Sequence, residues 1–196
     1  MTVNEAVRRL ATRLLRPIAA LLAAWGVHPN ALTLAGCLLT AGVGVFLAQG
    51  HWRLGGLLIV LTTLLDGLDG LVARLSGRTS RFGAFLDSTL DRYAEAALLF
   101  GLLIYYTREQ QRLDVLLLFV VLVGSLMVSY TRARAEGLDI ECKEGMLTRF
   151  ERLAILVLGL LSGQMRLALW ALAVLANLTA AQRVWVVWQK TDRGRA

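Results

Sequence analysis

Residues 66–91 read DGLDGLVARLSGRTSRFGAFLDSTLD and place Asp66, Asp69, Asp87 and Asp91 inside long apolar stretches. An ionised carboxylate in a helix at membrane depth costs at least ~2.5–3.5 kcal/mol. Four of them would cost about 10 kcal/mol, which is comparable to the whole stability of a domain. The four carboxylates therefore need compensation from a bound group, and this requirement decides both the fold and the chemistry.

The composition around this stretch is that of a membrane protein. Of the 196 residues, 57% are apolar and 18% are charged, whereas a soluble domain is nearer half apolar and a quarter charged. The apolar residues form blocks that short arginine-bearing stretches separate. This pattern argues against a water-soluble enzyme, a disordered chain and a disulfide scaffold. It predicts an all-α polytopic membrane protein whose residues 1–196 form a single domain.

The length of the apolar blocks predicts six transmembrane helices, because a span needs roughly 17–25 residues. The predicted spans are 31–49, 53–75, 82–106, 112–135, 149–163 and 165–188. Residues 1–27 precede this 31–188 core and carry apolar side chains on one helical face and arginines on the other. We expect them to form an amphipathic helix that lies in the membrane interface.

The basic residues predict the orientation of the spans. Sixteen of the 21 Lys and Arg residues lie in 8–16, 74–81, 132–152 and 183–195, which all fall on one side of the six-span plan. Cytoplasmic loops carry such an excess, so both termini and the aspartates are expected to face the cytoplasm of a multi-pass cell-membrane protein. The net charge of +7 is then explained by loops and anionic lipid, and we expect no nucleic-acid partner.

The spacing of the aspartates predicts how they are compensated. Asp66 and Asp69 share a helical face with Gly70, Ala73 and Arg74, and Gly83, Asp87 and Asp91 share a face of the next helix. A short loop joins the two helices, so their acidic faces can meet. An all-oxygen ligand set favours hard cations, here Mg²⁺ or Mn²⁺, and two ions would neutralise four carboxylates.

Two functions are compatible with these residues. A pair of divalent cations beside small residues and an arginine is suited to attack at phosphorus, with Arg74 binding a phosphate. A cation-coupled transporter also places acids inside a membrane. The transporter alternative does not explain why Arg74 and a glycine-lined cleft accompany the aspartates.

Written as Asp66-x₂-Asp69-Gly70-x₂-Ala73-Arg74-x₈-Gly83-x₃-Asp87-x₃-Asp91, the stretch resembles the signature of the CDP-alcohol phosphotransferases at every fixed position. The resemblance implies that a CDP-linked lipid such as CDP-diacylglycerol donates its phosphatidyl group to an alcohol and CMP leaves. It implies that the four aspartates hold the metals and that Asp91 is also the catalytic base. The residues implied to bind the CDP-lipid are Gly70, Ala73, Arg74 and Gly83 and, through a weaker match, Pro29, Asn30 and Thr33.

The acceptor is indicated by a second resemblance. Residues 129–136 and 149–152, with Thr179-x₃-Arg183, resemble the prokaryotic branch of this family that uses inositol phosphate. This implies a phosphorylated polyol acceptor whose phosphate is bound by Arg132, Arg149 and Arg183, and it also implies a homodimer. Two alternatives stay open: glycerol 3-phosphate as the acceptor, and a merely topogenic role for arginines in cytoplasmic loops.

Overall fold

The computed structural model describes residues 3–142 and 144–193, and these fold into helices joined by turns and one longer loop. The helices are α1 (Val3–Ala24), α2 (Pro29–Ala48), α3 (Trp52–Leu75), α4 (Arg81–Arg108), α5 (Arg112–Glu136), α6 (Arg149–Ser162) and α7 (Met165–Arg193). The all-α prediction is confirmed. Each helix begins and ends close to its predicted bounds, except that α7 continues past residue 188 to Arg193.

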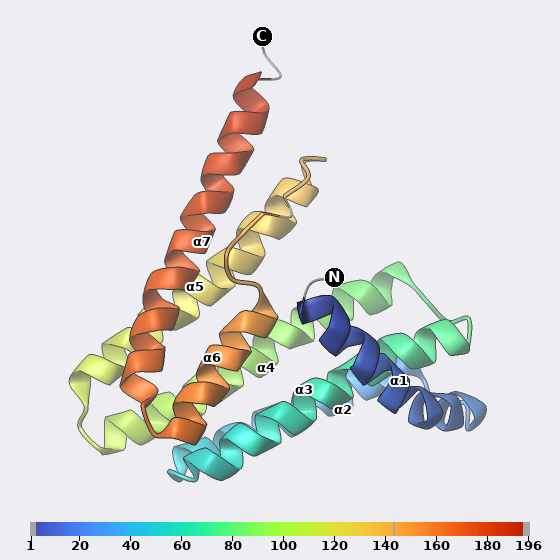
Figure 1. Ribbon diagram of the computed structural model, residues 1–196, viewed down its shortest axis with the longest axis horizontal. Helices are drawn as coiled ribbons and strands as arrows, with labels where there is room; N and C mark the ends of the chain where they lie inside the picture. The colour runs from blue at the N-terminus through green and yellow to red at the C-terminus, as the bar shows by residue number, and fades with distance from the viewer. Residues whose placement is uncertain (1–2, 143, 194–196) are drawn as a thin grey trace.

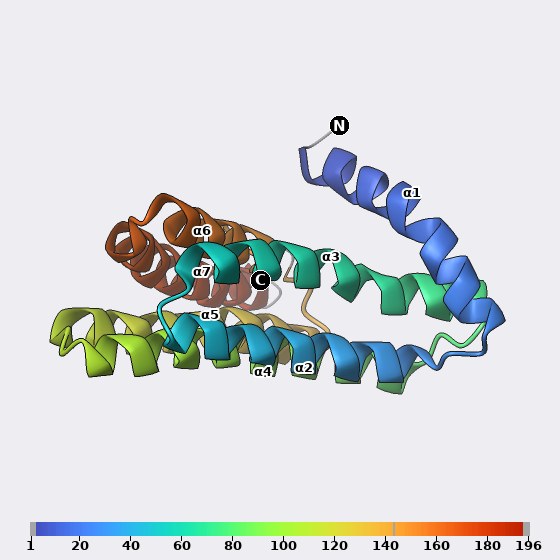
Figure 2. The same cartoon turned by 90° about the horizontal axis from the view of Figure 1, so that it is seen from below.

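The helices after α1 form two layers. Figure 2 shows α2, α4 and α5 in one layer and α3, α6 and α7 in the other, with α1 outside α3. The closest neighbours within and between the layers are α2 with α3 and α4, α5 with α4 and α7, α6 with α3 and α7, and α1 with α3. Gly44 and Gly101 allow the close approach of α2 and α4, because a Cβ on Gly101 would collide with the Gly44 carbonyl oxygen.

The two ends of the bundle differ. The short turns between α2 and α3, α4 and α5, and α6 and α7 gather at one end, at the lower left of Figure 1. The opposite end carries the connections from α1 to α2, from α3 to α4 and from α5 to α6. We call these the turn end and the loop end.

The largest hydrophobic core lies towards the turn end. Leu47, Ile59, Leu98, Leu118 and Leu169 are at most 1% exposed, and each comes from a different helix. The loop-end halves of α2, α3, α4 and α6 carry the polar side chains, which lie within 33–37, 66–69, 87–91 and 149–152. The core therefore fixes the helices beneath the polar residues.

The outward faces of the helices are apolar. Leu38, Leu57, Leu116, Leu158 and Leu167 are between 60% and 66% exposed. A water-soluble monomer rarely exposes so much contiguous apolar surface, whereas a protein that faces lipid does so over its whole circumference.

Four helices are long and apolar enough to cross a membrane: α2, α3, α5 and α7. The other two predicted spans differ for separate reasons. Helix α4 has 28 residues but carries Asp87, Asp91, Arg92 and Glu95, while α6 has only 14 residues and is ~21 Å long at 1.5 Å per residue. Six spans, like the interfacial position of α1, therefore stay predictions.

Candidate active site

The four aspartates of the signature line one small pocket between α2, α3, α4 and α6. Asp66 and Asp69 come from α3, and Asp87 and Asp91 come from α4. The same pocket is lined by Thr33, Cys37, Leu90, Ala94 and Arg149. The predicted meeting of the two acidic helix faces is therefore what the fold produces, and α2 and α6 close the pocket from the sides.

Each of three carboxylates has a partner within the protein. Arg149 contacts Asp66 Oδ2 through Nη2 at 3.2 Å and Asp91 Oδ1 through Nη1 at 2.7 Å. The hydroxyl of Thr33 donates to Asp69 Oδ2 at 2.7 Å. Sequence reasoning assigned Arg149 to the acceptor phosphate and did not anticipate its contact with the aspartates.

The donor set of this pocket suits a hard divalent cation. Its carboxylate and hydroxyl oxygens are the ligands that Mg²⁺ and Mn²⁺ prefer. In residues 3–142 and 144–193, no three His, Cys, Asp or Glu side chains are arranged to hold an ion. Three of the four carboxylates are instead oriented by other partners. The Arg149 guanidinium contacts Asp66 and Asp91, and the Thr33 hydroxyl contacts Asp69. The residues therefore fit a metal site in which those contacts are exchanged.

All seven residues implied to bind the CDP-lipid line one cavity of about 230 Å³ next to the aspartates. They are Pro29, Asn30, Thr33, Gly70, Ala73, Arg74 and Gly83. We call this space the donor cavity. Asp69 and Asp87 line it too, so it is continuous with the aspartate pocket.

Small residues and helix starts create the donor cavity. A Cβ on Gly70 would lie 3.4 Å from Arg74 Nη1, so the glycine leaves room for this guanidinium to fold back along α3. Ser80 caps α4 by accepting a hydrogen bond from Gly83 N at 2.9 Å. Helix α2 begins with Pro29, whose fixed φ suits a first helical residue. The sequence missed the contribution of the α3–α4 turn, since Arg78, Thr79 and Ser80 also line the cavity.

The three arginines implied to bind the acceptor phosphate also share a cavity. Arg132 from α5, Arg149 from α6 and Arg183 from α7 line a space of about 210 Å³. We call it the acceptor cavity. Asp91 and Arg149 line both this cavity and the aspartate pocket. The aspartates therefore lie between the donor cavity and the acceptor cavity.

A buried ion pair forms part of the lining of the acceptor cavity. Arg152 donates to Glu95 through Nε at 2.8 Å and through Nη2 at 2.7 Å, and its side chain is 3% exposed. This bidentate pair joins α4 to α6, and each of its residues lies one helical turn after Asp91 or Arg149 in the sequence. Sequence reasoning did not find the pair, although Glu95 follows Asp91 by four residues and Arg152 follows Arg149 by three.

Arg183 lies at the acceptor cavity but already has backbone partners. Its Nε donates to the Glu144 carbonyl oxygen at 2.9 Å, and its Nη1 donates to the Val128 carbonyl oxygen. Gly145 adopts a φ of 147° beside it, and a Cβ there would lie 3.0 Å from the guanidinium. Arg183 therefore fixes the α5–α6 loop in addition to lining the cavity.

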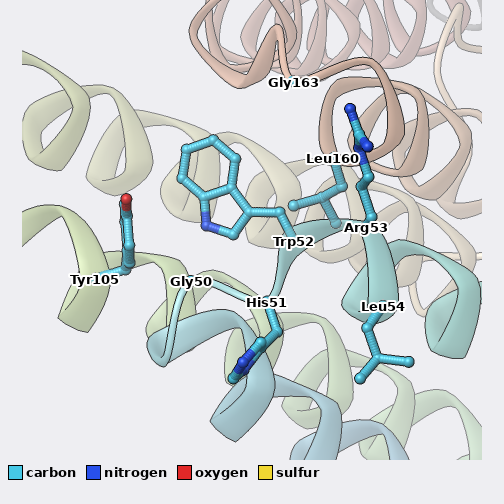
Figure 3. Close-up of a pocket in the computed structure, with 8 residues that line it drawn as sticks. All are labelled: Gly50, His51, Trp52, Arg53, Leu54, Tyr105, Leu160 and Gly163. Carbon is cyan, nitrogen blue, oxygen red and sulfur yellow. The ribbon is translucent and has the colours of Figure 1, made fainter.

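A more spacious cavity lies elsewhere. It measures about 440 Å³ and is lined at the turn end by residues that include His51, Trp52, Arg53 and Tyr105. Figure 3 shows Trp52 and Arg53 extending towards the α6–α7 turn at Gly163. The lining residues that the structure describes include no carboxylate. This cavity therefore lacks the chemistry of the aspartate pocket.

Known proteins resemble the chain over most of its length. A phosphatidylinositol phosphate synthase of Streptomyces avermitilis is 38% identical over 99% of this chain and 86% of its own. An archaetidylinositol phosphate synthase of Pyrococcus horikoshii is 36% identical over 88% of this chain and 90% of its own.

Solved structures resemble the fold as well. The phosphatidylinositol phosphate synthase of Mycobacterium tuberculosis with CDP-DAG bound superposes with a TM-score of 0.86 at 32% identity, covering 90% of this chain and 94% of that one. The same enzyme in complex with manganese and citrate superposes with a TM-score of 0.84, covering 88% of each chain. The CDP-alcohol phosphatidyltransferase family model matches residues 26–189. The chain thus belongs to the CDP-alcohol phosphatidyltransferase family.

Proposed function

We propose that this enzyme transfers a phosphatidyl group from a CDP-linked lipid, CDP-diacylglycerol, to a hydroxyl of inositol phosphate and releases CMP, as a step of phospholipid biosynthesis. One observation carries the proposal. The aspartate pocket shares Thr33, Asp69 and Asp87 with the donor cavity and Asp91 and Arg149 with the acceptor cavity. Donor and acceptor can therefore meet at the carboxylates from opposite sides.

The donor cavity binds the nucleotide end of the CDP-lipid. Arg74 offers a planar guanidinium to the pyrophosphate, and Gly70, Ala73 and Gly83 leave backbone accessible beside the cytidine. Pro29, Asn30 and Thr33, at the start of α2, also line this cavity. A relative of this chain was crystallised with CDP-DAG bound, which supports the choice of donor.

Asp66, Asp69, Asp87 and Asp91 hold two divalent cations, Mg²⁺ or Mn²⁺. Such ions stabilise the negative charge that develops on the phosphoryl oxygens and on the leaving group. The four carboxylates and the Thr33 hydroxyl among the lining residues support this assignment, and a relative was crystallised with manganese.

Asp91 accepts the proton of the acceptor hydroxyl, because it is the metal-binding aspartate that also lines the acceptor cavity. The hydroxyl oxygen attacks the phosphorus that carries the diacylglycerol. The bond from this phosphorus to the bridging oxygen breaks, and CMP leaves with that oxygen. Arg132, Arg149 and Arg183 hold the phosphate of the acceptor away from the reacting centre, since charge-assisted hydrogen bonds to phosphate are strong and directional.

The enzyme acts in the cell membrane as a single domain of six spans, with the loop end in the cytoplasm and α1 in the interface. The distribution of basic residues supports this orientation. A homodimer is the proposed assembly, on the strength of the family resemblance.

The test is CMP release by purified protein in detergent with CDP-diacylglycerol and Mg²⁺. Inositol 1-phosphate, glycerol 3-phosphate, inositol and serine are offered in parallel. Of the four acceptors, we expect only inositol 1-phosphate to support CMP release. Addition of EDTA should abolish this release. Release with glycerol 3-phosphate instead would overturn the acceptor. A cation-coupled transporter would release no CMP in detergent, because it needs a sealed vesicle and catalyses no group transfer.

A further inference from the structure

The position of Arg149 between two sites carries an inference beyond its role in the acceptor cavity. It is the first residue of α6, and its two Nη atoms contact Asp66 and Asp91 at 3.2 and 2.7 Å. The side chains of Arg149, Asp66 and Asp91 are 26%, 23% and 21% exposed. At this burial solvent screens the ion pairs only in part, so they matter energetically.

Arg149 leaves part of its own hydrogen-bonding capacity unused in this position. Its Nε is buried and has no hydrogen-bond partner. A buried donor without a partner is energetically unfavourable. The position among the aspartates therefore satisfies the Nη groups but not the whole guanidinium, whereas an acceptor phosphate offers several oxygens to the fork.

Two neighbouring arginines of the acceptor cavity have partners that are not part of the aspartate pocket. Arg152 is held by both oxygens of Glu95, and Arg183 is held by two backbone carbonyls. Arg149 differs from both because its partners are carboxylates that line the proposed metal site. Its availability to a phosphate therefore depends on what else those carboxylates bind.

We propose that Arg149 couples the two sites: it competes with the divalent cations for Asp66 and Asp91, and metal binding releases it to the acceptor phosphate. A cation and the guanidinium compete for these carboxylate oxygens, because two positive charges at this distance repel each other. Metal and acceptor therefore bind with positive coupling, and by linkage each increases the affinity for the other by the same factor. This inference rests on the proposed function for the identity of the acceptor but not for the competition itself.

The competition is tested by Mn²⁺ binding to the purified full-length protein in detergent, followed through the electron paramagnetic resonance signal of free Mn²⁺. Arg149→Gln removes the competing charge and is expected to tighten Mn²⁺ binding about tenfold. Arg92→Gln is the matched control, because Arg92 follows Asp91 in sequence but donates to the Ser88 carbonyl oxygen. It is expected to change the affinity less than about threefold. Arg149→Lys keeps a charge at the same place, so its affinity should return towards that of the unmodified protein even if Arg149→Gln folds poorly.

The coupling is tested by repeating the titrations with inositol 1-phosphate and, separately, with inorganic phosphate. We expect inositol 1-phosphate to tighten Mn²⁺ binding to the unmodified protein and to lose this effect in Arg149→Gln. Weaker or unchanged Mn²⁺ binding by Arg149→Gln would overturn the inference even if CMP release with inositol 1-phosphate were normal. Tighter Mn²⁺ binding without any effect of inositol 1-phosphate would retain the competition, overturn the coupling to this acceptor and place the failure in the proposed function.

Discussion

Asp91 is the residue on which the proposed chemistry depends most directly. It lines the aspartate pocket and the acceptor cavity but is not among the residues of the donor cavity. We expect Asp91→Asn to lower kcat by at least ~10²-fold, the typical contribution of a positioned general base. Binding of CDP-diacylglycerol should remain within a few-fold of normal. Single-turnover CMP release and equilibrium binding separate the two effects.

Asp69→Asn serves as the comparison for that prediction. Asp69 lines the donor cavity and accepts the Thr33 hydroxyl, so its replacement should weaken donor binding as well as turnover. Near-normal turnover by Asp91→Asn would remove Asp91 from its proposed role as base.

Arg183 combines a binding role with a structural one, and the two can be separated by kinetics. Arg183→Ala is expected to raise the KM for inositol 1-phosphate by about tenfold or more and the KM for CDP-diacylglycerol much less. The same replacement frees the carbonyl oxygens of Glu144 and Val128, so a lower unfolding midpoint should accompany it. An equal rise in both KM values would mean that the loop has collapsed and that Arg183 is structural alone.

At the scale of elements, helix α6 is held to α4 by the Glu95–Arg152 pair. Both side chains are nearly inaccessible, and removal of one partner leaves an uncompensated buried charge. We expect Glu95→Gln to destabilise the protein by ~3–5 kcal/mol, measured by thermal or denaturant unfolding in detergent. Arg132→Gln is the control, because it breaks the exposed pair with Glu136, and such i,i+4 pairs contribute only ~0.3–0.5 kcal/mol. Comparable effects of the two variants would contradict the anchoring role of Glu95.

The sequence predicted elements well where one physical signal governs them. Apolar blocks between arginine-bearing turns gave bounds within about two residues for α2 to α6. The end of α7 was wrong because the sequence after Trp188 is polar and carries no hydropathy signal. The helix continues there because Lys190 bridges to the Glu141 carbonyl oxygen and Glu144 Oε1 across the α5–α6 loop. That contact is long-range and has no local signature.

The same distinction applies to the site. The period of the helix was enough to bring the four aspartates together, because the residues of each pair lie on one face and a short turn joins the helices. The gathering of Arg132, Arg149 and Arg183 in one cavity came from resemblance, not from spacing, since they belong to three helices. The contacts of Arg149 with Asp66 and Asp91 connect positions 83 and 58 residues apart along the chain. Only the tertiary positions of α6 relative to α3 and α4 reveal them.

At the scale of the whole molecule, the number of spans depends on how a helix as short as α6 crosses the membrane. The hydrocarbon layer is ~30 Å thick, so a crossing by α6 would require the α5–α6 loop to enter it at the loop end. Irregular backbone is tolerated at membrane depth where the protein satisfies its polar groups. Here Leu147 N donates to Thr179 Oγ1, and Arg183 donates to the Glu144 carbonyl oxygen. These two described residues of the loop therefore have the partners that such a position requires.

This argument predicts which turns share a side of the membrane. Cys37 and Cys142 are first replaced by alanine, and single cysteines are then introduced. Cysteines at Glu109 and Gln164 report the turn end, and a cysteine at Leu138 reports the loop end. If α6 crosses, an impermeant maleimide should label Glu109→Cys and Gln164→Cys in intact cells and Leu138→Cys only after permeabilisation. Labelling of Gln164→Cys together with Leu138→Cys would show that α6 re-enters without crossing. In that case α7 would run in the opposite direction to the six-span plan. The positive charges of residues 183–193 would then face outward, against the bias that orients such helices.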